Sequence, residues 1–387
     1  MPAEMTVACY YFPNYHVDPR NERVHGKGWS EWALVRRAEP RYPGHRQPRV
    51  PLWGYEDESD PLVMAKKIDS AADHGIDAFI FDWYWYNDGA FLERGLDRGF
   101  LGAANNHRLK FSLMWANHDW KDIHPARLGE SRQGFLSGYP ILYPGAVSRS
   151  TFDTIIDVAL ERYFSHPSYW LIEGCPYFSI YDLPCLVAGL GGIEATQQAL
   201  AYFRQRVKAS GFRDLHLNGV LWNPHALSSA GTVMDAASLV RTFHFDSVTS
   251  YVWIHHARLD TFPETDYNQI RDAYLAYAEY IARQLPVPYF PNITMGWDSS
   301  PRTLPSDTYE EAAYPFSAAM GNNSPQHFQQ ACKMIKQFLD GRASAQRICT
   351  INAWNEWTEG SYLEPDTETG LAYLQAIRSV FIQAEKG

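Results

Sequence analysis

Two glutamates near the carboxyl end of the chain carry the clearest chemical signal. Glu356 and Glu359 lie in the run Ile351-Asn352-Ala353-Trp354-Asn355-Glu356-Trp357-Thr358-Glu359-Gly360. A pair of carboxyl groups is the minimum equipment for glycosidic cleavage, because one protonates the leaving oxygen while the other supplies electrons or activates a nucleophile. We expect the flanking indoles of Trp354 and Trp357 to lower the local dielectric and to separate the two pKa values. The alternative is that both glutamates are ordinary charges at the start of a loop or helix.

The glutamates follow the last of eight short apolar runs that predict strands. The runs are near-continuously apolar rather than alternating, which is typical of parallel strands covered on both faces. The predicted strands are Thr6–Phe12, Asp77–Tyr84, Leu109–Ala116, Pro176–Tyr181, Leu215–Trp222, Phe245–Trp253, Val287–Thr294 and Arg347–Trp354. Amphipathic stretches between and after them predict helices at Asp60–His74, Phe91–Asn105, Phe152–Phe164, Ile193–Gly211, Val233–Leu239, Asn268–Gln284, Pro325–Leu339 and Gly370–Glu385.

Alternating strands and helices indicate an α/β protein, and eight units favour a (β/α)8 TIM barrel. An open doubly wound sheet is the alternative, but Tyr-Phe-Pro-Asn-Tyr-His follows the first strand where that fold needs a glycine-rich phosphate turn. Long connections at residues 14–59, 118–150 and 298–324 leave the carboxyl ends of strands, where a barrel carries its active site. No linker or composition break interrupts the chain, so residues 1–387 are predicted to form a single catalytic domain.

Composition narrows the class of protein. The 387 residues include 34 Lys and Arg against 44 Asp and Glu, a net charge of −10 that excludes a nucleic-acid partner bound through bulk charge. Hydrophobic residues make up 45% of the chain, enough for a sizeable core. The five cysteines are odd in number and lie mostly in apolar runs, which predicts reduced thiols. No signal peptide or membrane span is recognisable, so we expect a cytoplasmic protein without a membrane partner.

Aromatic and amide side chains at predicted strand ends suit a saccharide pocket, because sugar rings stack on aromatic planes and their hydroxyls pair with polar groups. At the end of the second strand, alternation sends Asp82 and Tyr84 to one face and Trp83 to the other, without saying which face is inside. The alternative for each aromatic residue is a place in the core. The predicted substrate-binding residues are Tyr11, His16, Trp29, Glu31, Trp32, Asp82, Trp83, Trp115, Asn117, His118, Asp119, Trp222, Tyr251, Trp297, Trp354, Asn355 and Trp357.

The sequence predicts no cofactor and no metal. His118, Asp119, Asp122 and His124 offer suitable ligand atoms but match no standard metal-binding spacing. The adjacent pair His255-His256 points to opposite faces of an extended segment and cannot easily share an ion. A Gly-x-Ser-x-Gly elbow, a phosphate-binding Gly-rich loop and a His-Glu-x-x-His motif are also missing from the sequence.

The run Trp-Asn-Glu-Trp-Thr-Glu-Gly, followed by Leu363-Glu364-Pro365, closely resembles the Asn-Glu-Trp-x-Glu-Gly…Glu-Pro signature of glycoside hydrolase family 99 and of the WbsX-like, family 99-like proteins. The resemblance to the WbsX-like proteins spans nearly the whole chain in the expected order. The other matching blocks are Tyr10-Tyr11-Phe12-Pro13-Asn14-Tyr15-His16, Gly28-Trp29-Ser30-Glu31-Trp32, Gly44-His45-Arg46-Gln47-Pro48, Gly75-Ile76-Asp77-Ala78-Phe79 and Trp115-Ala116-Asn117.

This resemblance implies a (β/α)8 barrel and a retaining glycoside hydrolase; family 99 enzymes cleave α-mannosidic linkages inside glycans. It also implies that Glu356 assists the sugar's own 2-hydroxyl in attacking the anomeric carbon, and that Glu359 acts as acid and then base. The chain departs from the family at His118-Asp119, where the WbsX-like pattern has Glu-Asn. This departure changes the charge and the hydrogen bonding at the end of the third strand. The sequence therefore does not identify the sugar that the protein binds.

Two other functions remain from the sequence. WbsX-like proteins have been named glycosyltransferases, although no nucleotide-sugar site is recognisable here, and a barrel could bind carbohydrate without cleaving it. The hydrolase hypothesis requires Glu356 and Glu359 to project together into a water-accessible hollow. Either acid held in a buried ion pair or pointing out to bulk solvent, remote from the aromatic-lined mouth, would remove the mechanism.

Overall fold

A parallel β-barrel forms the centre of the protein. The computed structural model describes residues 5–222, 227–229, 232–342 and 346–382. The barrel strands are β1 (Met5–Tyr11), β2 (Ala78–Tyr86), β4 (Lys110–Trp115), β8 (Cys175–Ile180), β9 (His216–Leu221), β12 (Ser247–Ser250), β14 (Tyr289–Phe290), β15 (Asn292–Thr294) and β17 (Arg347–Asn352). The order β14-β12-β9-β8-β4-β2-β1-β17-β15 starts and ends on one run of chain, since only Pro291 separates β14 from β15. The sheet therefore closes, which confirms the predicted TIM barrel.

Helices surround the barrel at most of the predicted positions. They are α3 (Pro61–Asp73), α5 (Arg149–Val158) with its continuation η3 (Ala159–Phe164), α7 (Ile193–Ala209), α8 (Ala236–Phe243), α9 (Tyr267–Gln284), α10 (Pro325–Asp340) and α11 (Ala372–Phe381). The segment predicted as the weak helix Val233–Leu239 divides between β11 (Thr232–Met234) and α8, because Asp235 caps the helix by accepting from the backbone of Ser238.

One prediction was wrong in this layer, and one helix was missed. The long helix predicted at Phe91–Asn105 is reduced to η1 (Gly95–Phe100) and η2 (Asn106–Arg108), while Phe91 ends the hairpin strand β3 (Gly89–Phe91). Close packing explains the short helix, since a Cβ on Gly99 would lie 2.1 Å from the carbonyl oxygen of Glu58. The helix α6 (Leu183–Leu190) was not predicted, because its nearly continuous apolar sequence lacks a helical stripe.

Polar side chains hydrogen-bond to one another inside the barrel. The Ser179 hydroxyl donates to Asn218, whose amide donates to Ser247 at 2.9 Å, and the Asn292 amide donates to Thr350 at 3.1 Å. All five of these residues are fully buried. Such groups must satisfy one another when water is excluded, so the network fixes the strands against each other.

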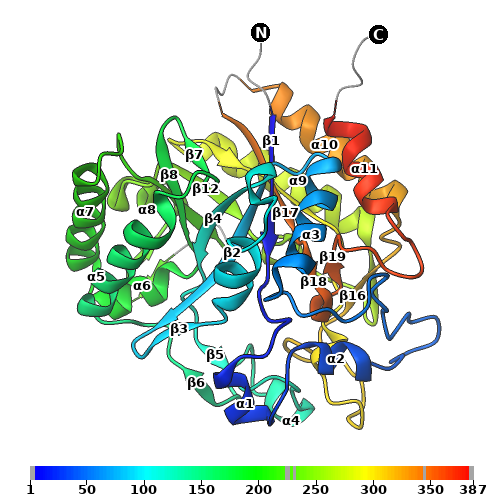
Figure 1. Cartoon of the computed structure of the whole chain (residues 1–387). Helices are drawn as coiled ribbons and strands as arrows, with labels where there is room; N and C mark the ends of the chain where they lie inside the picture. Colours follow the sequence, from blue (N-terminus) through cyan, green and yellow to red (C-terminus); the bar gives the residue numbers. More distant parts are fainter. Residues whose placement is uncertain (1–4, 223–226, 230–231, 343–345, 383–387) are drawn as a thin grey trace, which may run out of the picture.

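The loops that leave the carboxyl ends of the strands carry their own short elements. Figure 1 shows α1 (Pro19–His25), α2 (Trp32–Arg37), α4 (Leu128–Ser131), β5 (Trp120–Lys121) and β6 (Ile141–Tyr143) at the end of the barrel toward which β1 points. The last strand leads there into β18 (Asn355–Glu356), η6 (Trp357–Glu359) and β19 (Ser361–Tyr362). The predicted glutamates therefore lie at the loop-covered end of the barrel.

Candidate active site

A cavity of about 710 Å³ opens at the carboxyl ends of the strands. Side chains at the end of most barrel strands contribute to its wall, and aromatic rings form much of it. Glu356 and Glu359 both line this cavity. The two carboxyls share one hollow, and both also form buried ion pairs at its wall, next to the cavity and not remote from it.

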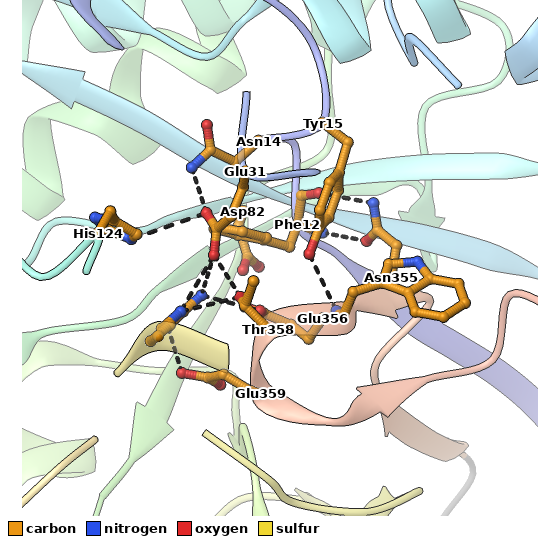
Figure 2. A network of polar contacts seen from close by, with 12 residues as sticks. Phe12, Asn14, Tyr15, Glu31, Asp82, His124, Asn355, Glu356, Thr358 and Glu359 are labelled. Atoms are coloured by element: carbon orange, nitrogen blue, oxygen red, sulfur yellow. Dashed lines mark hydrogen bonds and ion pairs between the residues drawn. The ribbon is translucent and has the colours of Figure 1, made fainter. Parts of the chain in front are cut away.

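That cluster is centred on Arg302, which belongs to η5 (Ser300–Arg302) in the loop after β15. Its Nη1 lies 2.6 Å from Glu359 Oε1, and its Nη2 lies 3.2 Å from Glu356 Oε2 and 3.0 Å from Glu31 Oε1. Figure 2 shows Glu31, Glu356 and Glu359 converging from different segments. One guanidinium thus bridges both candidate catalytic carboxyls and a third acid behind them.

Glu31 is fully buried and is held by several donors. The Asn14 amide donates to Glu31 Oε2 at 2.5 Å, and the Thr358 hydroxyl donates to its other oxygen. His124 Nε2 lies 3.8 Å from Oε2. These contacts provide partners for both oxygens of the Glu31 carboxylate, which does not itself line the cavity. Glu31 therefore orients Arg302 from the side of the guanidinium that faces away from the cavity.

The two candidate catalytic carboxyls have different environments. The Tyr314 hydroxyl donates to Glu359 Oε1 at 2.7 Å, and Arg302 binds the same oxygen. Burial raises the pKa of Glu359, and Arg302 and Tyr314 oppose that rise. Burial and the neighbouring Glu359 charge raise the pKa of Glu356 well above its ordinary value, with Arg302 opposing. Each carboxyl is therefore less acidic than in water, and the two ionisations depend on one another.

A third carboxyl, Asp82 at the end of β2, also lines the cavity. The Tyr251 hydroxyl lies 2.8 Å from Asp82 Oδ2 and 3.3 Å from Glu356 Oε1, so this single hydroxyl connects the two acids. Tyr84 lines the cavity while Trp83 packs outside it, which decides the alternation that the sequence left open.

The loop that carries both glutamates is fixed by hydrogen bonds to the first strand. The Asn355 side chain accepts from the Phe12 backbone N–H at 2.8 Å and donates to the Phe12 carbonyl at 2.7 Å. The backbone N–H of Trp357 donates to the Tyr15 hydroxyl at 3.1 Å. The Asn355 side chain thus binds both backbone groups of Phe12, as a neighbouring strand would. The position of Glu356 is therefore set by the segment that follows β1 as well as by β17.

Glu364 anchors the indoles of the same loop. It accepts from Trp354 Nε1 at 2.9 Å and from Trp357 Nε1 at 2.7 Å, and its charge is met by Lys67 Nζ at 2.6 Å. Both indoles are fully buried, and Trp357 also stacks on Tyr362 with ring centroids 3.7 Å apart. The tryptophans therefore pack beneath the loop and do not face the cavity.

Asp298 links the loop after β15 to the glutamate loop. Its backbone N–H donates to the Glu359 carbonyl at 2.6 Å, and its Oδ2 contacts His45 Nε2 at 2.8 Å and the Gln47 amide at 2.7 Å. Its other oxygen accepts from the backbone of Ser300, next to Arg302 in η5. Burial alone would raise the pKa of Asp298, but His45 and the other hydrogen-bond donors lower it to about 2.

The structure divides the predicted site residues into two groups. Besides the two glutamates, those on the cavity wall are Asp82, His118, Asp119, Trp222, Tyr251 and Trp297. Those away from the wall are Tyr11, His16, Trp29, Glu31, Trp32, Trp83, Trp115, Asn117, Trp354, Asn355 and Trp357. Most of the second group are buried in the packing around the site.

Several wall residues were not predicted. Arg302 and Tyr314 come from the long loop at residues 298–324, and Phe12, Trp120, Tyr181 and His255 complete much of the aromatic wall. The sequence predicted that this long loop helps to form the active-site pocket. No residue pattern within the loop distinguished Arg302 from its neighbours. Only the folded chain brings Arg302 to the glutamates.

Within the described ranges, the structure contains no group of three or more His, Cys, Asp or Glu side chains arranged to hold a metal ion. His118 Nδ1 contacts the backbone oxygen of Asp119 at 3.0 Å. Trp222 and His255 stack with ring centroids 4.7 Å apart. His118 is thus engaged in a hydrogen bond and His255 in ring stacking.

Comparison with known proteins places this fold among glycoside hydrolase-like barrels. A GH99 endo-alpha-mannosidase from Bacteroides thetaiotaomicron superposes with a TM-score of 0.56 at 14% identity, covering 97% of this chain and 96% of that one. A structure described as a glycoside hydrolase-like protein gives a TM-score of 0.60 at 14% identity, covering 99% and 95%. At such identities the similarity shows the fold alone.

The chain belongs to the family described as Glycosyltransferase WbsX, whose model matches residues 7–377. It is 28% identical over 98% of its length to the uncharacterized protein WxcX of Xanthomonas campestris pv. campestris. The chain spans about half the length of that curated relative, 50%. In the described part of the chain, no helix has the length and apolar character needed to cross a membrane.

Replacing Arg302 with methionine should destabilise the protein strongly, because three buried carboxyls lose their common cation. Removing one partner of a buried ion pair costs about 3–5 kcal/mol. Without the arginine, the pKa values of Glu356 and Glu359 rise further above the unfolded value of 4.5, so the destabilisation should grow as the pH rises above that value and shrink below it.

Thermal unfolding of Arg302→Met from about pH 4 to pH 8 measures this effect. Arg258→Met is the control, since Arg258 lies on the cavity rim with 92% of its side chain exposed. Equal melting temperatures for Arg302→Met and the parent protein at pH 8 would contradict the proposed role of the ion cluster.

Asp298→Asn should lower stability at neutral pH. Because folding lowers the pKa of Asp298 from 3.8 to about 2, its ionised form contributes about 2 kcal/mol above the unfolded value. That contribution disappears as the pH falls through the folded value. The difference in unfolding free energy between variant and parent should therefore narrow between about pH 4 and pH 2, whereas Asp272→Asn, at a side chain that is 59% exposed, should show no such difference. A difference in unfolding free energy that does not change with pH would contradict the lowered pKa of Asp298.

Proposed function

We propose that this chain is a glycoside hydrolase that cleaves a glycosidic bond in a glycan or glycoside, with Glu356 and Glu359 as catalytic carboxyls. One observation carries the proposal. Both acids face one aromatic-walled cavity at the carboxyl end of a TIM barrel and are bridged by the same guanidinium. Burial gives both carboxyls raised pKa values, which suits acid and base chemistry near neutral pH.

The cavity suits a saccharide in size and lining. Its volume of about 710 Å³ falls in the range of small-molecule pockets. Trp120, Trp222 and Tyr84 offer aromatic surface, while His118 and Asp119 add hydrogen-bonding groups at the end of β4. These features support a carbohydrate substrate, and the departure from the family pattern at residues 118 and 119 lies on the wall that would select the sugar.

Cleavage with retention is the mechanism that we propose. The resemblance to family 99 assigns Glu356 to the nucleophilic step: its carboxylate removes the proton of the sugar's 2-hydroxyl, whose oxygen then attacks the anomeric carbon. The leaving oxygen keeps the electron pair of the broken bond and takes a proton from an acid. The same resemblance assigns Glu359 as that acid and, in the second step, as the base that activates water.

Glycosyl transfer is the second candidate, favoured by the description of the family. A nucleotide-sugar donor carries a negatively charged diphosphate, which proteins commonly hold with cationic groups. Among the described residues of the cavity wall, Arg302 is occupied by three carboxylates, Lys121 Nζ lies 3.9 Å from Asp119, and the exposed Arg258 at the rim lies 3.6 Å from Asp260. This charge arrangement favours an uncharged glycoside over a nucleotide sugar. A barrel that binds carbohydrate without cleaving it is the third candidate, and the pair of acids on the wall counts against it.

Glu356→Gln and Glu359→Gln should each reduce cleavage by orders of magnitude while leaving the fold intact, because each removes a carboxyl needed in the transition state. The assay is release of phenol or reducing sugar from a panel of aryl glycosides and oligosaccharides. Glu310→Gln is the matched control, since Glu310 pairs with Arg132 at the surface. Full activity of Glu356→Gln or Glu359→Gln would refute the catalytic role of that glutamate. Turnover that depends on a nucleotide sugar would establish glycosyl transfer instead.

The first sugar product should keep the anomeric configuration of the substrate. Retention follows from two successive displacements at the anomeric carbon. Proton NMR recorded within the first minutes of cleavage, before mutarotation, reads the configuration directly. An inverted product would exclude the proposed two-step route while leaving hydrolysis itself in place.

A further inference from the structure

A corner of the cavity wall outside the Arg302 cluster is formed by His118, which follows β4, and Asp182, which follows β8. Asn117 ties these two strand ends together, because its amide donates to the Asp182 carbonyl at 2.7 Å and its side-chain oxygen accepts from the Asp182 backbone N–H at 2.8 Å. The charges of His118 and Asp182 shift the pKa values of one another. The fully buried Asn117 therefore holds two half-buried polar side chains close together at the cavity.

The ring of His118 presents a hydrogen-bond acceptor to the cavity. Its Nδ1 lies 3.0 Å from the backbone oxygen of Asp119, and a carbonyl oxygen can only accept, so Nδ1 carries the ring proton. Burial lowers the pKa of His118, which keeps the ring neutral at neutral pH. The lone pair is then on Nε2, which has no hydrogen-bond partner within the described residues and is not sealed off by protein atoms.

The carboxylate of Asp182 presents a second acceptor. Its Oδ1 accepts from the Cys185 backbone N–H at 2.8 Å and so caps α6. Burial raises the pKa of Asp182, while the Cys185 hydrogen bond and the charge of His118 oppose that rise and favour the ionised form. In the part of the chain that the structure describes, Oδ2 forms no ion pair and no hydrogen bond, and it too is open to the cavity.

Asp119, the neighbouring acid on the wall, already has partners for both oxygens. Its Oδ1 accepts from the Gly145 backbone N–H at 2.9 Å, and its Oδ2 lies 3.9 Å from Lys121 Nζ. The acceptors left for a ligand at this corner are therefore Nε2 of His118 and Oδ2 of Asp182.

We infer that His118 and Asp182 are specificity-determining residues, which select a sugar with free hydroxyl groups at the two positions that face this corner. One hydroxyl donates to Asp182 Oδ2 and another donates to His118 Nε2. A hydroxyl supplies the proton that an acceptor needs, whereas an ether, an ester or a fluorine supplies none. The site then favours unsubstituted sugars over O-methylated or O-acylated ones. The inference rests on the proposed hydrolase function and leaves the roles of Glu356 and Glu359 unchanged.

The test pairs changes in the protein with changes in the sugar. On the glycoside that the parent protein cleaves, Asp182→Asn should lose about 10- to 100-fold in kcat/KM, because an amide donor replaces the acceptor of the sugar hydroxyl. One monodeoxy derivative of that glycoside should cost the parent protein a similar factor. On this derivative Asp182→Asn should lose less than about 3-fold against the parent, since the contact is already missing.

His118→Phe should give the same pattern with a different monodeoxy derivative. Asp260→Asn is the control, because Asp260 lies beside Arg258 with 57% of its side chain exposed, and it should match the parent protein on every substrate. A purely structural role predicts equal losses on all derivatives. Such equal losses for Asp182→Asn and His118→Phe would overturn the inference.

Deoxyfluoro sugars test the direction of the hydrogen bonds. Fluorine can accept weakly but brings no proton, so a deoxyfluoro sugar should bind as weakly as the matching deoxy sugar. Quenching of tryptophan fluorescence measures the Kd values, since Trp120 and Trp222 line the cavity. A deoxyfluoro sugar that binds as tightly as the parent sugar at both positions would overturn the inference.

Asp182→Ser covers the case in which Asp182→Asn does not fold, because serine also caps helices but lacks the carboxylate. If the parent protein cleaves no glycoside of the panel, the proposed hydrolase function fails, and the same comparison of variants and deoxy sugars is made on Kd values. Cleavage without the expected pairing of residue and hydroxyl would overturn the inference alone. Failure of every sugar to bind would overturn both.

Discussion

The buried guanidinium of Arg302 is the interaction around which this site is built. It joins the loop after β1, through Glu31, to the loop after β17, through Glu356 and Glu359, and it comes itself from the loop after β15. Charges of this kind are expensive to bury, and they persist only when their geometry satisfies them. The contacts of Asn14, Thr358 and Tyr314 supply that geometry.

Side chains behind the Arg302 cluster hold the loops in fixed positions relative to one another. Asn355 pairs with the backbone of Phe12, Glu364 holds the indoles of the glutamate loop, and Asp298 ties that loop to η5. Each anchor is a polar side chain that satisfies backbone or indole N–H groups in a region without a regular sheet. Catalytic groups need such fixed positions, because small displacements at a reacting centre are costly.

The family is described as a glycosyltransferase, whereas the fold is similar to that of glycoside hydrolases. The two descriptions are compatible. Barrels of this type support many chemistries, and the side chains at the strand ends determine which one occurs. Here the wall carries several carboxyls, aromatic rings and an arginine already neutralised by acids. We propose bond cleavage on an uncharged sugar at this wall, which differs from the family pattern at His118 and Asp119.

The sequence alone indicated the barrel, because eight near-continuous apolar runs alternate with helical patterns and no glycine-rich phosphate turn follows the first of them. It also marked Glu356 and Glu359, whose spacing and aromatic neighbours are local features of the chain. It failed at η1 and α6, where packing against Glu58 and an all-round apolar sequence override periodicity. Tertiary structure alone decided which aromatic residues face the cavity: Trp354 and Trp357 turn inward to Glu364, while Trp222 lines the wall. It also decided that Arg302 meets the glutamates, since residues 54 positions apart in the chain are brought together by the pairing of β15 with β17, which no local pattern encodes.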